Sequence, residues 1–393
     1  MDYENWWLLA LPIFFLFGWL AARIDIKQLL NESKRVPSTY VDGINYLLNN
    51  DTDRAIDVFV ELASSDPESI ELQFAVGALF SQRGEIQRAL LVHQAILDKP
   101  GLSSIERNQA LLAVGQDYLK SGMHDRAEQY LKRVDVNSSD QSALLLLIEL
   151  YVTQGDWESG IKTAVKYQSL SGESQSGLIA HFMMECAEDD FKEQRSDLVM
   201  FWIDRANREY PNSPRALIML GKVRYAQGEY QDALSVWMLI RENHPDFFVL
   251  VLPLFLETCR RLTQMSECLE ILKEFFLAIP CEETFQFIFQ IQTELSGEAS
   301  AHQLARELFL KSGHSALIIP VFASLKCEMG NFEDASDIVF KKIADGLKTT
   351  LCHKCESCGF EANSHYWRCP ACQSWDTYSP IKTHTTRDKN DGR

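Results

Sequence analysis

The sequence lacks an excess of positive charge, and it lacks the usual catalytic signatures. It has 38 Lys and Arg residues against 55 Asp and Glu, for a net charge of −17. Proteins that bind duplex nucleic acid need a basic surface to displace counterions, so this balance argues against nucleic acid as a partner. GxSxG, P-loop, HExxH and GxGxxG motifs are all missing from the 393 residues. We therefore predict a protein that is not an enzyme.

Strand signals are almost absent between residues 38 and 345, where short amphipathic helices alternate with small turns. One pattern recurs there: Gly or another small turn residue, four further residues, then a small residue. Six copies are clear, and they end at Ala55, Ala89, Ala127, Gly160, Ala233 and Ala335. Their turn residues are Asn50, Gly84, Gly122, Gly155, Gly228 and Gly330, and degenerate copies lie near Glu193, Thr263 and Gly297. We count about nine units.

A period near 34 residues with this turn is typical of tetratricopeptide repeats (TPRs). Glycine supplies the left-handed end of the first helix, and the small residue lets the second helix approach closely. Gly77 and Gly221, each seven residues before a turn glycine, are further small positions. The predicted fold is therefore an all-α TPR solenoid over residues 38–345. Such an array presents a long concave surface for peptides or domains, and its period does not identify the partner.

Isolated residues within the array carry little functional signal. The single histidines His181, His244, His302 and His314 are interpreted as packing or surface residues. The scattered cysteines are interpreted as small buried hydrophobes; these are Cys186, Cys259, Cys268, Cys281 and Cys327. The Phe-rich run from Phe247 to Glu257 is predicted to be helix core, with an exposed partner site as the alternative.

The N-terminus also lacks basic residues, and this argues against a cleaved signal peptide. Residues 6–22 are 17 residues without a charge, with tryptophans near both ends, so we predict a membrane anchor over residues 1–22 rather than a buried core helix. Residues 23–37 form a basic juxtamembrane linker. The positive-inside rule then places the body in the cytoplasm, where reduced thiols remain available as metal ligands.

Five of the ten cysteines lie between Cys352 and Trp375. Cys355 and Cys358 form one C-x2-C pair, and Cys369 and Cys372 form another. Two such turns facing each other make a tetrahedral four-sulfur site for iron or zinc, with Gly359 and Pro370 shaping the turns. We predict a metal-binding domain over residues 350–380, folded by its metal and packed with aromatic side chains: Phe360, Tyr366, Trp367, Trp375 and Tyr378.

The residues that flank the two cysteine pairs are less well defined by the sequence. Cys352 and His353 are left out of the predicted ligand set, and the sequence does not assign them a role. The domain is expected to dock against, or extend, the last helices of the array. Residues 381–393 are polar and are predicted to be a disordered tail.

The anchor, the repeats and the C-x2-C-G-F…Y-W-x-C-P-x-C hairpin, in this order, resemble the lipopolysaccharide assembly protein B (LapB) family of Gram-negative bacteria. The similar parts include residues 40–59, 84–97 and 355–375. The resemblance implies a rubredoxin-like domain in which Cys355, Cys358, Cys369 and Cys372 hold the metal. It also implies a location at the cytoplasmic face of the inner membrane. The implied activity is that of an adaptor that promotes degradation of the lipid A pathway deacetylase LpxC by the membrane protease FtsH.

The resemblance further implies a second membrane protein that restrains the adaptor, and contacts with the lipopolysaccharide synthesis and export machinery. Two alternatives remain at this point: a redox carrier with a four-sulfur iron centre, and a general TPR scaffold for another inner-membrane assembly. A homodimer is compatible with the sequence, because tandem arrays and anchors can both dimerise.

Overall fold

A computed structural model describes residues 38–49, 51–136, 141–312, 351–380 and 383–384. The predicted anchor and linker over residues 1–37 lie outside the described residues, as do the repeat copy at Gly330, Cys327 and His314. No helix in the described ranges combines the length and the hydropathy that a membrane span requires.

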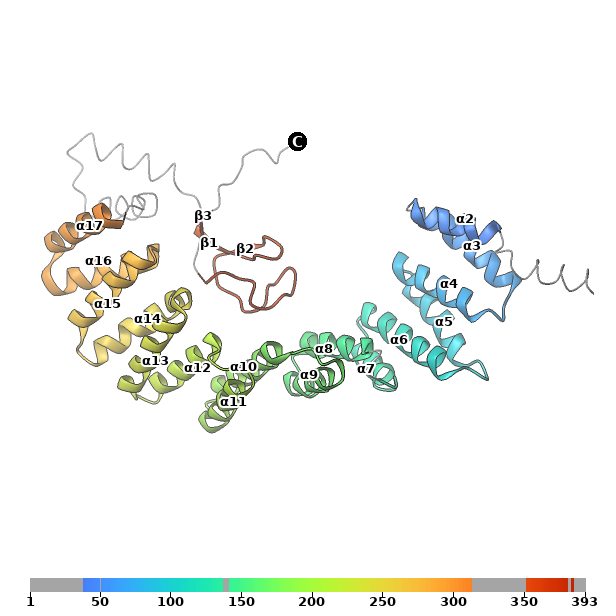
Figure 1. Cartoon of the computed structure of the whole chain (residues 1–393), viewed down its shortest axis with the longest axis horizontal. Coiled ribbons are helices and arrows are strands. Elements are labelled where there is room, and N and C mark those ends of the chain that lie inside the picture. The colour runs from blue at the N-terminus through green and yellow to red at the C-terminus, as the bar shows by residue number, and fades with distance from the viewer. Residues whose placement is uncertain (1–37, 50, 137–140, 313–350, 381–382, 385–393) are drawn as a thin grey trace, which may run out of the picture. The chain divides into compact units, whose positions relative to one another are not determined.

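The described part of the array consists of α-helices of 8 to 17 residues joined by short turns (Figure 1). The chain divides into two compact units, residues 1–154 and 155–393. The first unit contains α2 (Ser38–Leu48), α3 (Thr52–Ser65), α4 (Ile70–Arg83), α5 (Ile86–Leu97), α6 (Ser104–Lys120), α7 (His124–Leu131) and α8 (Ser142–Gln154). Successive helices in this unit pack on one another, as a TPR-like solenoid requires.

The second unit continues the same alternation and adds a small β-sheet. Its helices are α9 (Trp157–Ser171), α10 (Ser176–Lys192), α11 (Ser196–Glu209), α12 (Pro214–Ala226), α13 (Tyr230–Asn243), α14 (Pro245–Arg261), α15 (Met265–Ala278), α16 (Glu282–Ser296) and α17 (Glu298–Ser312). Its strands are β1 (Leu351–Lys354), β2 (Glu361–Ala362) and β3 (Thr383–His384), which form an antiparallel sheet in the order β2-β1-β3. Two residues of the tail predicted to be disordered therefore form β3.

The turns between paired helices share one backbone conformation. At Gly84, Gly122 and Gly228, φ lies between +74° and +86°, and the next amide bonds to the carbonyl five residues back. The degenerate repeats keep this geometry without glycine: Gln194 and Thr263 have φ of +60° and +59° and are followed by the same hydrogen bond. This left-handed conformation costs a non-glycine residue about 1–2 kcal/mol. Because the local sequence disfavours it at Gln194 and Thr263, the packing of the flanking helices must stabilise these two turns.

Close packing within helix pairs depends on glycines in the first helix. A Cβ added at Gly77 would lie 2.3 Å from the His93 ring, and one at Gly221 would lie 2.3 Å from the Trp237 ring. A Cβ at Gly43 would likewise be too close to Phe59, and one at Gly115 too close to Leu131. In all four pairs the contacted residue lies 16 positions after the glycine. The small residues of the second helices are fully buried beside them, at Ala55, Ala89, Ala127 and Ala233.

A core cluster of the second unit includes buried residues from Leu217 to Leu308. The Phe-rich run of α14 contributes Phe248, Val251, Leu252 and Phe255 to it, so most of that run is helix core as predicted. Cys259, Cys268 and Cys281 are buried in the same cluster as small apolar residues, whereas Cys186 is half-buried.

Candidate metal centre

The two C-x2-C turns have the same backbone structure. In the first turn, the Gly359 amide donates to the Cys355 carbonyl at 2.8 Å, and the Cys355 amide donates to the Phe360 carbonyl at 2.9 Å. In the second turn, Gln373 and Ser374 take the places of Gly359 and Phe360, with distances of 3.0 and 2.8 Å. Gly359 and Gln373 both have positive φ, which closes each turn. The two cysteines of each turn therefore converge on one point.

The four sulfur atoms of Cys355, Cys358, Cys369 and Cys372 all lie within 4.8 Å of one another. Two pairs, Cys355–Cys372 and Cys358–Cys369, are separated by 3.7 Å. This is far longer than a disulfide of about 2.05 Å. It agrees with the edge of a tetrahedron around an ion with metal–sulfur bonds of about 2.3 Å, which is about 3.8 Å. The cluster therefore fits one tetrahedral ion, and its chemistry suits both zinc and iron.

The environment of the cluster favours some thiolates and disfavours others. Hydrogen bonds from the Ser374 hydroxyl and amide lower the pKa of Cys372 to about 6. The Phe360 amide favours the Cys358 thiolate, but desolvation and the three neighbouring sulfurs outweigh it and raise the pKa of Cys358 to about 12. Four thiolates this close repel one another, so a bound cation is needed for all four to be ionised.

Burial of the cluster is uneven. Cys355 and Cys369 are buried with Tyr378 at the centre of the hairpin, Cys372 is half-buried and Cys358 is exposed. The site is therefore open to solvent on the Cys358 side. Phe360 and Tyr366 are also exposed, at 40% and 41%, so the predicted aromatic shell is incomplete there.

The two residues that the sequence left unassigned lie on β1. The backbone of Cys352 pairs with Thr383 of β3. His353 is buried, and its Nδ1 bonds to the Ser379 carbonyl at 2.9 Å. Among the described residues, the group of atoms close enough to share an ion contains the four cysteines and no histidine. His353 thus holds the end of the hairpin to β1.

Among the described helices, the hairpin docks on α10, α12 and α14. The last helices of the predicted array, on which docking was expected, lie outside the described residues. His181 of α10 bonds through Nε2 to Asp376 Oδ2 at 2.6 Å, and its ring stacks on Trp375 at 4.8 Å. Phe247 of α14 stacks on Trp367 at 5.4 Å with the rings only 3° from parallel. Trp367 and Trp375 therefore face the helices and do not enclose the cysteines.

Arg215 of α12 is the buried charge at the centre of this contact. Its Nη2 donates to Glu185 at 2.8 Å and to Glu188 at 3.0 Å, and its guanidinium lies 5.5 Å from the Trp367 ring. Its Nη1 lies 3.4 Å from His181 Nδ1. Because arginine can only donate, His181 Nδ1 accepts, and the Nε2 proton is donated to Asp376. A chain of polar contacts therefore runs from α10 and α12 into the hairpin.

Sequence reasoning missed this contact surface. The sequence predicts His181 only as a packing or surface residue, and Arg215 belongs to no recognised motif. Phe247 is the first residue of the Phe-rich run, for which the sequence left an exposed partner site as the alternative to helix core. Phe247 does contact a partner, but that partner is Trp367 in the hairpin of the same chain. A usable signal was the spacing of His181, Arg215 and Phe247, which is close to one repeat and places them on three successive first helices.

Family models match two parts of the chain. Residues 353–380 match the family described as "Rubredoxin metal binding domain". Residues 215–246, which cover α12 from its second residue and all of α13, match the tetratricopeptide repeat. The two matches agree with a TPR-like solenoid that ends in a four-cysteine hairpin.

Curated relatives match nearly the whole chain. Lipopolysaccharide assembly protein B of Escherichia coli K12 is 27% identical over 382 residues, covering 95% of this chain and 97% of the relative. The protein of the same name from Haemophilus influenzae is 26% identical over 391 residues, with the same coverage. Among solved structures, a tetratricopeptide repeat protein from Parabacteroides merdae covers 79% of this chain and 97% of its own, at 12% identity and a TM-score of 0.33.

Proposed function

We propose that this chain, a homologue over nearly its whole length of lipopolysaccharide assembly protein B, acts in lipopolysaccharide assembly as a membrane-anchored adaptor. In this proposal it sits on the cytoplasmic face of the inner membrane and presents the deacetylase LpxC to the protease FtsH. A second membrane protein restrains it when lipopolysaccharide is scarce. Cys355, Cys358, Cys369 and Cys372 hold one iron or zinc ion with a structural role.

The observation that carries the proposal is the full-length similarity to proteins of that name, combined with the architecture of the second unit. A TPR-like array offers binding surface without chemistry, which suits an adaptor. The hairpin adds to that surface, because Trp367, Trp375 and Asp376 attach it to three successive first helices. A membrane tether would raise the effective concentration of such a body near an anchored protease, so weak contacts would suffice.

The test uses the organism that carries this chain. Three chromosomal versions are compared: the full chain, the chain without residues 1–22, and the chain with those residues replaced by an unrelated membrane-spanning helix. Protein synthesis is stopped, and the half-life of LpxC is followed by immunoblot. We expect rapid turnover with the full chain, a stabilised LpxC without the anchor, and partial recovery with the unrelated helix.

Two outcomes would contradict the proposal. Normal LpxC turnover with the anchorless chain would show that the tether is not required. An unchanged LpxC half-life after deletion of the whole chain would remove the adaptor role and favour a general scaffold. A purified protein that cycles reversibly between two iron oxidation states and has a physiological electron donor would instead favour the redox carrier.

A further inference from the structure

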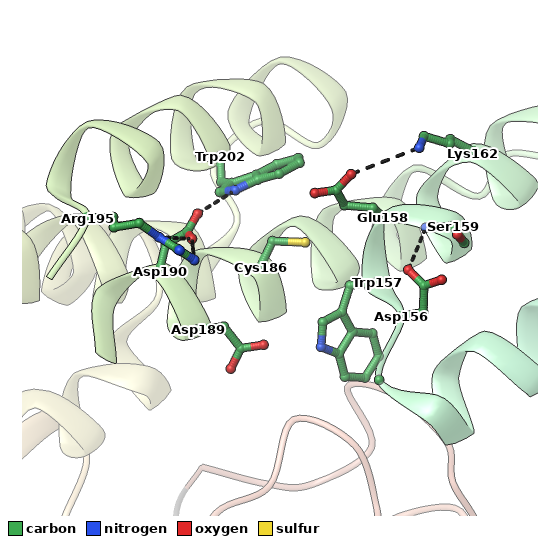
Figure 2. Close-up of a pocket in the computed structure, with 11 residues that line it drawn as sticks. Asp156, Trp157, Glu158, Ser159, Lys162, Cys186, Asp189, Asp190, Arg195 and Trp202 are labelled. Atoms are coloured by element: carbon green, nitrogen blue, oxygen red, sulfur yellow. Dashed lines mark hydrogen bonds and ion pairs between the residues drawn. The ribbon is translucent and has the colours of Figure 1, made fainter. Parts of the chain in front are cut away.

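A cleft of about 300 Å³ lies between the start of α9, the end of α10 and the start of α11, and the four clustered cysteines are not part of its lining. It is lined by two tryptophans, Trp157 and Trp202, by the Cys186 thiol and by charged side chains (Figure 2). Its volume is at the lower end of the range for ligand sites, which suits a single side chain better than a large molecule.

The aromatic walls of the cleft are held in place from behind. The Trp202 indole donates to Asp190 Oδ2 at 2.9 Å, and Asp190 is itself buried and bonded to Arg195. Trp157 packs on the fully buried Phe182 at 5.8 Å. In Figure 2 the two indoles come from different helices and lie on either side of Cys186. Both rings are therefore positioned before any ligand arrives.

The charge of the cleft is negative. Its lining has four carboxylates, Asp156, Glu158, Asp189 and Asp190, against two cations, Lys162 and Arg195. Glu158 is exposed, and its contact with Lys162 is long, at 3.9 Å, so that pair neutralises little. Burial, followed by the charges of Glu158, Asp190 and Asp189, raises the pKa of the Cys186 thiol to about 12. Burial disfavours any charge at the sulfur itself, whereas the neighbouring carboxylates make the open part of the cleft more favourable for a cation than for an anion.

We propose that this cleft binds a lysine or arginine side chain from an extended segment of a partner protein. The indole faces of Trp157 and Trp202 would contact the cation, and Glu158 would pair with it. Tryptophan is the best aromatic partner for such a cation, and an arginine of this chain, Arg205, already lies 5.8 Å from the Trp202 ring. The inference goes beyond the proposed function and does not depend on it, because peptide binding to the purified chain can be measured in the absence of LpxC and FtsH.

The test selects binders from a phage-displayed library of random dodecapeptides against the purified full-length chain. The enriched peptides are synthesised, and their affinities are measured by calorimetry. We expect them to share a Lys or Arg. Replacing that residue by a neutral counterpart, citrulline for arginine or acetyl-lysine for lysine, should abolish binding. Glu158→Lys should weaken binding about tenfold, and Trp202→Leu should weaken it about three- to thirtyfold.

The matched control is Glu68→Lys, which makes the same charge change at an exposed residue of the first unit. It should alter the affinity less than twofold, which separates a local site from general attraction to an acidic protein. Glu158→Lys changes an exposed side chain, so it keeps the test valid if Trp202→Leu folds poorly. Equal affinity of the peptides for the Glu158→Lys and Glu68→Lys chains would overturn the proposal. Undiminished binding of a peptide whose arginine is replaced by citrulline would also overturn it, as would a selection that enriches no basic peptide.

Discussion

Replacing Gly221 by alanine tests whether the glycine positions of the first helices set the spacing of the helix pairs. The new Cβ would lie 2.3 Å from two carbon atoms of the Trp237 ring and 2.8 Å from a third. Carbon atoms normally approach to about 3.5–4.0 Å, so the ring must withdraw by about 1 Å or more. Trp237 is fully buried and its Nε1 donates to Thr258 Oγ1 at 3.2 Å, so it cannot move into solvent without loss.

The expected cost follows from these contacts. Overpacking costs about 1–3 kcal/mol, and the strained Trp237–Thr258 hydrogen bond adds about 1 kcal/mol. Against this, alanine is favoured over glycine in a helix by about 1 kcal/mol. We therefore expect Gly221→Ala to lower the free energy of unfolding by about 1–3 kcal/mol. Gly177 in α10 is the matched control, because a Cβ there meets nothing within 4 Å.

The assay is urea unfolding of the full-length chain followed by circular dichroism, together with hydrogen exchange of peptides from α12 and α13. Exchange is included because a repeat array can unfold in parts. Gly221→Ala should show a lower midpoint and faster exchange in those two helices, and Gly177→Ala should match or exceed the parent chain. A Gly221→Ala chain as stable as the Gly177→Ala chain would refute the reasoning.

Three further predictions concern the hairpin and the degenerate turns. Cys369→Ser should lose the metal and unfold the hairpin while the helices remain, as measured by elemental analysis and by hydrogen exchange of residues 351–380; an unchanged metal content would rule this out. Thr263→Gly should raise the free energy of unfolding by about 1 kcal/mol, because Thr263 has φ of +59°, and an equal or lower urea midpoint would contradict it. Burial, followed by the nearby His353, lowers the pKa of His365 to about 4, so the folded hairpin binds this proton less readily than the unfolded chain does. The stabilisation is complete above about pH 6.5 and is lost as the pH falls towards 4. The protection of hairpin amides, corrected for the pH dependence of intrinsic exchange, should therefore fall more between pH 7 and 5 in the parent chain than in His365→Gln; equal losses of protection would argue against it.

Much of the helical array was predictable, because each repeat encodes its own turn locally. The turn glycines and the small residues that follow them occur at a period typical of tetratricopeptide repeats, and even Gln194 and Thr263 lie close to the positions that the spacing indicated. The pairing of Cys355 with Cys358 and of Cys369 with Cys372 was visible for the same reason, since two thiols three residues apart belong to one tight turn.

The sequence by itself determined the elements whose causes lie within about 35 residues: the helices, their turns and the two cysteine turns that bring four sulfurs within 4.8 Å. Only the tertiary structure decided where the hairpin sits. The contact between His181 and Asp376 joins residues 195 positions apart, and Arg215 is buried without any local pattern that marks it. Long-range contacts of this kind depend on the shape of the packed helices, which no short stretch of sequence encodes.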